Sequence, residues 1–198
     1  MPHQPAETDI YFAPDRDAWR NWLETYHMTK KQVWLVQYRK SNPGSCVGYE
    51  DAVQEALCYG WIDSKPRKRD DHSYLLFFSK RKPNSVWSAS NKKRVEVLLK
   101  NGLIKPAGLA SIEVARTNGS WSRIDDAEAI VMPPDLAEAL SLNKRAADFF
   151  AQFPPSAKRG IYTWISIART EITRKNRIDE TVRLAAQNVR ANQWQPKK

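Results

Sequence analysis

Charged, hydroxyl and aromatic side chains that could form a binding pocket are concentrated in one stretch of the chain, residues 61–91. They are Trp61, Asp63, Arg67, Arg69, Arg81, Ser85, Trp87, Ser88 and Asn91. Guanidinium groups bind carboxylates and phosphates in a planar fork geometry, and indole rings pack on flat or apolar groups. The stretch therefore predicts a pocket for an anionic ligand or an acidic part of a protein partner, but it does not define a reaction.

A helix is expected to begin inside this stretch, and its first turn would also attract negative charge. Ser88 or Ser90 can cap a helix that carries Val95 on its apolar face. The free N–H groups and the dipole of a helix start favour anions. Ser85, Ser88 and Asn91 are equally well explained as capping groups that meet no ligand, so both interpretations stay open.

The larger side chains also have a simpler structural explanation. Trp61 and Trp87 could pack in the core or over a sheet, as large aromatic residues usually do. Asp63 could form a structural ion pair with Arg67 or Arg81 and never contact a ligand. The pocket and the packing roles make opposite predictions about which of these side chains reach solvent.

The positive charge of the chain is unevenly distributed. The net charge is +10, and residues 61–100 hold eleven Lys or Arg against four Asp or Glu, a net of +7. Clustered cations raise the local concentration of polyanions, so nucleic acid is a second candidate partner, with Tyr74, Phe77 and Trp87 stacking on bases. A solvated basic surface without a function would give the same composition.

Two further arginines, Arg174 and Arg177, are expected on one face of a C-terminal helix because they are three residues apart. If that face meets the basic stretch, the two guanidinium groups would complete the anionic pocket. Ion pairs with Glu171, Asp179 or Glu180 are the alternative.

Residues for catalysis or for holding a cofactor are not apparent. The three histidines, His3, His27 and His72, have no Cys, Asp or Glu at the spacing of a metal site, and the chain has no glycine-rich phosphate loop and no nucleophile elbow. We therefore expect a non-catalytic protein with no metal and no cofactor. An enzyme of unknown reaction is the alternative, with Asp63 as its candidate acid.

Local signals mark the elements that would position these side chains. Asp15 precedes an apolar pattern at helical spacing, which predicts a capped helix over residues 16–26, and a second helix should end at Gly60. Residues 33–38 alternate as a strand and should pair with residues 74–78, the second arm of a hairpin. We therefore predict an α+β fold, with a small antiparallel sheet of about three strands packed by helices, followed by an all-helical C-terminal module.

Three segments are expected along the chain. They are an α+β domain at 1–121, a linker at 122–134 and a helical module at 135–198. No run approaches 18 apolar residues, and the N-terminus lacks the basic and apolar regions of a secretory signal, so a cytoplasmic location is expected. The sequence does not predict an oligomeric state.

Three separated motifs resemble the YdeI/OmpD-associated family. The first runs from Glu55 to Asp63 and contains Gly-Trp-Ile-Asp, the second covers residues 81–91 and contains Ser-Val-Trp-Ser, and the third covers residues 164–178. Together they extend the likeness from about residue 12 to about residue 184. The sequence departs from the family pattern at Tyr59, where phenylalanine is usual, and at residues 79–80, where Ser-Lys replaces Thr-Pro.

The resemblance implies a role in bacteriocin protection or in resistance to antimicrobial peptides and other stress. It implies no reaction, cofactor or catalytic residue. The family is also linked to an outer-membrane porin, but that association would require export, which the N-terminus does not encode, so the porin is not expected as a partner here.

Overall fold

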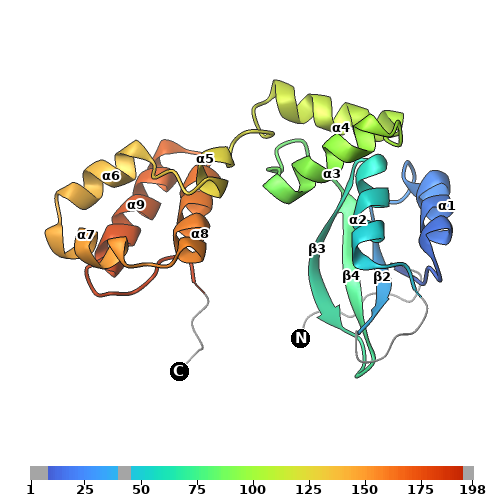
Figure 1. Ribbon diagram of the computed structural model, residues 1–198, viewed down its shortest axis with the longest axis horizontal. Coiled ribbons are helices and arrows are strands. Elements are labelled where there is room, and N and C mark those ends of the chain that lie inside the picture. Colours follow the sequence, from blue (N-terminus) through green and yellow to red (C-terminus); the bar gives the residue numbers. More distant parts are fainter. Residues whose placement is uncertain (1–8, 40–45, 194–198) are drawn as a thin grey trace. The chain divides into compact units, whose positions relative to one another are not determined.

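The computed structural model describes residues 9–39 and 46–193, and the chain divides into two compact units (Figure 1). Unit 1 comprises Met1–Ser85 and Ser90–Asn118, and unit 2 comprises Val86–Ala89 and Gly119–Lys198. The segment Val86–Ala89 therefore belongs to unit 2, although it lies within the sequence of unit 1. The predicted α+β class is confirmed.

Unit 1 is built on a four-stranded sheet with the strand order β1-β2-β4-β3. The strands are β1 (Ile10–Tyr11), β2 (Gln32–Tyr38), β3 (Trp61–Lys68) and β4 (Ser73–Lys80). Strand β4 pairs antiparallel with both β2 and β3, and Leu35 of β2 lies opposite Leu76. The predicted pairing of residues 33–38 with residues 74–78 is confirmed.

The sequence pattern does not predict β1, which pairs in parallel with β2. Two residues are too few to show the alternation that marks a strand. In the described residues the sheet is therefore mixed and four-stranded, rather than an antiparallel sheet of about three strands.

Helices α1 (Arg16–Tyr26) and α2 (Tyr49–Cys58) lie side by side on one face of this sheet (Figure 1). Asp15 caps α1 as predicted, because its side chain accepts a hydrogen bond from the Ala18 N–H. Trp19 joins the layers: its indole donates to the Ala52 carbonyl of α2 at 3.0 Å, and its ring lies 5.3 Å from that of Phe78 in β4. The core of unit 1 therefore sits between the sheet and these two helices.

Helices α3 (Ala89–Lys100) and α4 (Pro106–Thr117) complete unit 1. The end of α2 is fixed by two glycines. Gly60 has φ +73°, the left-handed conformation that stops a helix, as the sequence predicts. Gly108 allows α4 to approach closely, because a Cβ there would lie 2.3 Å from the Cys58 carbonyl oxygen. The chain thus turns sharply from α2 into β3, which places Trp61 and Asp63 at the start of that strand.

Unit 2 is helical in its described part. Its helices are α5 (Asp125–Glu128), α6 (Pro134–Ser141), α7 (Lys144–Ala151), α8 (Pro155–Ser166) and α9 (Glu171–Ala185). Their core includes Leu136, Phe150 and Ile161, all at most 1% exposed. Helix α5 lies in the segment 122–134 that was expected to be a linker, and its Ala127 is buried in the same core.

Within the described residues, none of the helices has the length and apolar character needed to span a membrane.

Candidate functional site

A pocket of about 420 Å³ lies in unit 1, where the β3–β4 hairpin extends past the N-terminal end of α2 (Figure 1). It is lined by Arg39, Tyr49, Asp63, Ser64, Pro66, Arg67, Lys68, Tyr74 and Leu76. The pairing of β3 with β4 shifts register between Asp63 and Pro66, and such a bulge changes the direction in which neighbouring side chains point. The volume is within the range of pockets that hold small ligands.

Positive charge dominates the wall of this pocket. Arg39, Arg67 and Lys68 stand against one carboxylate, Asp63. Lys68 is ion-paired at 2.7 Å with Asp71, but both side chains are largely exposed. The guanidinium of Arg39 makes no hydrogen bond or ion pair with the described residues, so none of them competes with an incoming anion for it.

Asp63 interacts with Tyr49 and with Arg81. Its carboxylate accepts a hydrogen bond from the Tyr49 hydroxyl at 3.0 Å. Burial lowers the pKa of Arg81 to about 10, and the charge of Asp63 works against that lowering. Burial, followed by the charge of Asp63, raises the pKa of Tyr49. These interactions make Asp63 an electrostatic partner of Arg81, one of the two arginines expected to pair with it.

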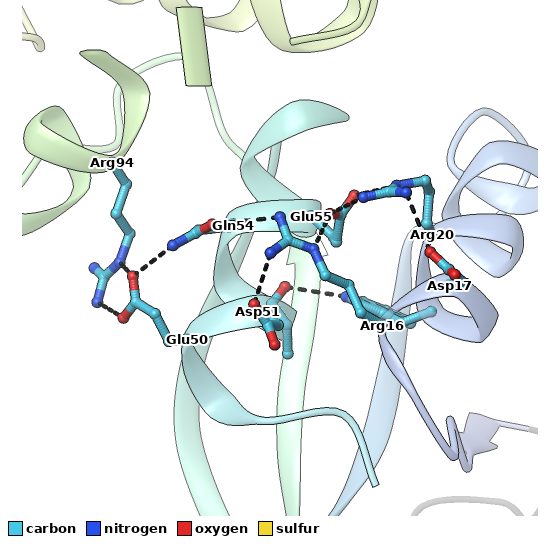
Figure 2. Close-up of polar contacts among 10 residues, drawn as sticks. Arg16, Asp17, Arg20, Glu50, Asp51, Gln54, Glu55 and Arg94 are labelled. Atoms are coloured by element: carbon cyan, nitrogen blue, oxygen red, sulfur yellow. Dashed lines mark hydrogen bonds and ion pairs between the residues drawn. The ribbon is translucent and has the colours of Figure 1, made fainter. Parts of the chain in front are cut away.

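Asn91 lies in the first turn of α3 and does not line the pocket. Its side chain is buried, and its Oδ1 accepts a hydrogen bond from Arg94 Nη1 at 2.9 Å. Arg94 also donates two hydrogen bonds of 2.7 Å to the carboxylate of Glu50, which ties α3 to α2. Figure 2 shows this fork beside Gln54, which donates to the same carboxylate at 3.1 Å.

Four other predicted residues of unit 1 do not line the pocket, and they are Trp61, Arg69, Arg81 and Ser85. The Trp61 ring is 1% exposed and meets the Trp22 ring edge-on at a centroid distance of 5.8 Å, so it is part of the core. Arg69 is exposed next to the hairpin turn. Ser85 closes a turn, with its N–H donating to the Lys82 carbonyl.

Four predicted residues lie in unit 2 or its inserted segment, and they are Trp87, Ser88, Arg174 and Arg177. The Trp87 ring is 1% exposed and packs 4.9 Å from the ring of Trp121. Arg174 donates to both oxygens of Asp135, at 2.6 and 2.9 Å. Arg177 donates to the Trp164 carbonyl and lies over the ring of that residue. Arg174 is thus ion-paired, as the alternative held, but to a different acid from the three considered.

A polar network between α1 and α2 was missed by the sequence analysis (Figure 2). At its centre, Glu55 is only 2% exposed and accepts hydrogen bonds from Arg16 at 2.6 Å and from Arg20 at 3.0 and 2.7 Å. Arg16 also pairs with Asp51 at 2.7 Å. Burial of Glu55 opposes its ionisation, but the hydrogen bonds from Arg20 and Arg16 outweigh burial and lower its pKa.

A signal for this network exists in the sequence. Arg16 and Arg20 are four residues apart on one predicted helix, and Asp51 and Glu55 are four residues apart on another. Two basic residues on one helix and two acidic residues at the same spacing on another indicate that these two helix faces pack against each other. For the pocket, the predicted pairing of the strand over 33–38 with the hairpin places Arg39 beside that hairpin.

By its fold the chain is an α+β protein with a separate helical unit. Residues 11–111 match a family described as a domain of unknown function (DUF8412), and residues 129–188 match a family described as bacteriocin-protection, YdeI or OmpD-associated. The first match spans just over half of the 198 residues, so the chain belongs to the DUF8412 family. The second match confirms the YdeI/OmpD-associated resemblance and places it in unit 2.

Neither a search of curated proteins nor a search of solved structures found a match to the chain.

Proposed function

We propose that the protein acts in bacteriocin protection as a binding protein, and that the pocket of unit 1 takes an anionic ligand or an acidic segment of a protein partner. The match of residues 129–188 to the bacteriocin-protection family supports the role. The charges that line the pocket support the class of ligand.

One observation carries the proposal: the guanidinium of Arg39 lines the pocket and has no carboxylate partner among the described residues. Arginine binds carboxylate and phosphate groups through two parallel hydrogen bonds, which gives both affinity and orientation. Arg67 and Lys68 add positive charge to the same wall. An anion that enters this pocket therefore meets three cationic side chains and one carboxylate.

Apolar side chains make up much of the remaining lining. Pro66, Tyr74 and Leu76 contribute ring and aliphatic surface, and Leu76 is almost fully buried. A pocket that combines an apolar floor with a few oriented polar groups favours a ligand with a flat or apolar part beside its charge. Phenyl phosphate should therefore bind more tightly than inorganic phosphate.

The test is isothermal titration of the full chain with phenyl phosphate, inorganic phosphate and citrate. Replacing Arg39→Glu or Arg67→Glu should weaken phenyl phosphate binding about tenfold or more, because each change puts a carboxylate where the anion binds. Arg69→Glu is the matched control: it removes the same charge from an exposed residue near the end of the hairpin, outside the lining, and should change affinity less than twofold.

The same variants should be compared for survival of cells exposed to a bacteriocin. Loss of protection in Arg39→Glu but not in Arg69→Glu would connect the pocket to the role. Phenyl phosphate binding that is unchanged in both pocket variants would exclude the pocket as the ligand site, even if protection is retained.

Nucleic acid is the alternative partner, but the structure argues against the stacking of Trp87 on bases that this alternative included. Trp87 is 1% exposed and cannot stack on a base, while Tyr74 and Phe77 are half-buried. Fluorescence anisotropy with a labelled single strand and a labelled duplex distinguishes the two partners. Binding that falls steeply as salt rises would favour nucleic acid, and absence of binding at low salt would remove it.

A further inference from the structure

A second pocket, of about 480 Å³, forms a groove between α6 and α9 in unit 2. Its lining residues on α6 and at the end of that helix are Asp135, Glu138, Ala139 and Leu142, and those on α9 are Glu171, Arg174, Lys175, Ile178 and Asp179. Both sets include residues spaced i, i+3, i+4 and i+7, so each helix turns one continuous face toward the groove. The groove is therefore a regular feature of two packed helices.

Three apolar side chains line this groove, and one of them is an exposed leucine at the end of α6. Leu142 has 85% of its surface exposed, the largest fraction among the exposed large hydrophobic residues of the described chain. Ala139 is half-buried and Ile178 is 6% exposed, so Leu142 supplies most of the apolar surface that a partner could cover. A leucine with this exposure adds almost nothing to the stability of the folded unit, because little of its apolar surface is buried. It can, however, pack against an apolar side chain of a partner.

The rim of the groove has a net negative charge, in contrast to the chain as a whole, which is +10. Arg174 is neutralised by Asp135 at 2.6 Å, and Lys175 by Asp179 at 2.5 Å. Glu138 and Glu171 remain, and neither makes an ion pair or a side-chain hydrogen bond with the described residues. One uncompensated carboxylate thus stands on each of the two helices.

We propose that this groove is a docking site for a cationic amphipathic helix of a partner. Apolar side chains of that helix would cover Leu142 and Ala139, and its Lys or Arg residues would pair with Glu138 and Glu171. A bound metal ion fits less well, since no group of three or more His, Cys, Asp or Glu side chains in the described residues could hold one. The proposal concerns unit 2 and does not depend on the pocket of unit 1.

The test is fluorescence anisotropy of a labelled helical peptide of about 18 residues, five turns, built from Leu on one face and Lys on the other. A second peptide has Glu in place of every Lys. The full chain carrying Arg39→Glu, which disables the anion pocket of unit 1, should bind the Lys peptide and not the Glu peptide at about 0.1 M salt. Equal binding of both peptides, or binding of neither, would overturn the proposal.

Variants locate the binding to the groove. Glu138→Gln with Glu171→Gln should weaken binding of the Lys peptide about tenfold, and Leu142→Ser should weaken it severalfold. The matched control, Glu113→Gln with Glu180→Gln, removes two exposed carboxylates outside the groove and should leave affinity unchanged. All the changed side chains are at the surface, so the variants should fold, which circular dichroism checks.

Sedimentation equilibrium of the same proteins provides an independent check. The chain should show no self-association that depends on Leu142. A dimer that Leu142→Ser dissolves would mean that a second copy covers the groove, and it would overturn the proposal, as would unchanged peptide affinity in the Glu138 and Glu171 double variant.

Discussion

Glu55 is a carboxylate with only 2% of its surface exposed, held by two arginines of the neighbouring helix. Taking a charged group out of water is costly unless hydrogen bonds replace the lost hydration. Arg16 and Arg20 supply three hydrogen bonds between them. If Glu55 were neutral, Arg16 would keep Asp51 and Arg20 would keep the exposed Asp17, but both would lose the one buried carboxylate that they share.

Replacing Glu55→Gln should therefore lower the free energy of unfolding by about 2–3 kcal/mol, measured by urea denaturation near pH 7. The value is below that of a fully buried pair because the Arg16 and Arg20 side chains are 32% and 37% exposed. Asp17→Asn is the control, since Asp17 is 81% exposed in its pair with Arg20 and its loss should cost at most about 0.5 kcal/mol. Equal losses in the two variants would contradict this account.

The acid dependence of stability follows from the same residues. Hydrogen bonds from Arg94 and then Gln54 lower the pKa of Glu50 to about 2, and the pKa of Glu55 is also lowered. Because both folded-state values lie below the unfolded value, the stabilisation is present above about pH 4.5 and is lost as pH falls below it, in the case of Glu50 toward about pH 2. Unfolding free energies from pH 7 to pH 3 should fall less steeply in Glu55→Gln than in the unchanged chain, and parallel curves would contradict the prediction.

At the scale of elements, the sequence predicts those helix ends that are determined by residues close to them in the chain. Asp15 caps α1 and Gly60 ends α2, because a cap and a left-handed glycine act within a few residues of their position. Strand β1 is two residues long and exists only through its pairing with β2, more than twenty residues later in the chain. No local pattern could show it.

In the candidate site, too, the lining residues that were predicted share one element, and those that come from other elements were not predicted. Asp63 and Arg67 line the pocket and were predicted, because β3 carries both of them. Arg39 and Tyr49 come from other elements and meet β3 only in the fold. Trp87 has the residue type expected of a pocket, but burial against Trp121 gives it a packing role that a short sequence motif does not reveal. Spacing thus identifies neighbours within an element, and tertiary packing decides which elements meet.

The close approach of α4 to the end of α2 gives a prediction at this scale. Gly108→Ala should destabilise the protein by about 1–3 kcal/mol, because its Cβ would lie 2.3 Å from a backbone oxygen and the helices must separate. Gly160→Ala is the matched control on α8: its Cβ would meet only the Gln193 side chain at 3.6 Å, so the higher helix propensity of alanine should stabilise by up to about 1 kcal/mol. Thermal unfolding of both variants checks the opposite signs, and a stabilised Gly108→Ala would contradict the packing argument.

At the scale of the whole molecule, the two units do not follow the order of the chain. The tetrapeptide Val86–Ala89 belongs to unit 2, and its Trp87 packs on Trp121. The chain therefore passes from unit 1 to unit 2, returns, and passes to unit 2 again at Gly119.

Trp87→Ala should consequently destabilise unit 2 more than unit 1, by about 3 kcal/mol, because it removes a large buried side chain. Hydrogen exchange resolved by residue is the measurement. Faster exchange in α8 and α9, with β2 and β4 unchanged, is the expected result. Faster exchange in the sheet alone would mean that Trp87 serves unit 1. Phe149→Ala, a change of a half-buried ring in unit 2, gives a reference for a smaller loss.

The insertion of Val86–Ala89 into unit 2 also constrains how the protein is made on the ribosome. Synthesis proceeds from the N-terminus, so Trp87 is made before any of residues 119–198, and it leaves the ribosome before they do. Until Trp121 and the helices of unit 2 are complete, the indole has no partner from that unit and is an apolar site for chaperones. A pause in translation after Trp87 has left the ribosome, but before the helices of unit 2 have left it, would prolong that exposure, whereas a pause before Trp87 has left it would not.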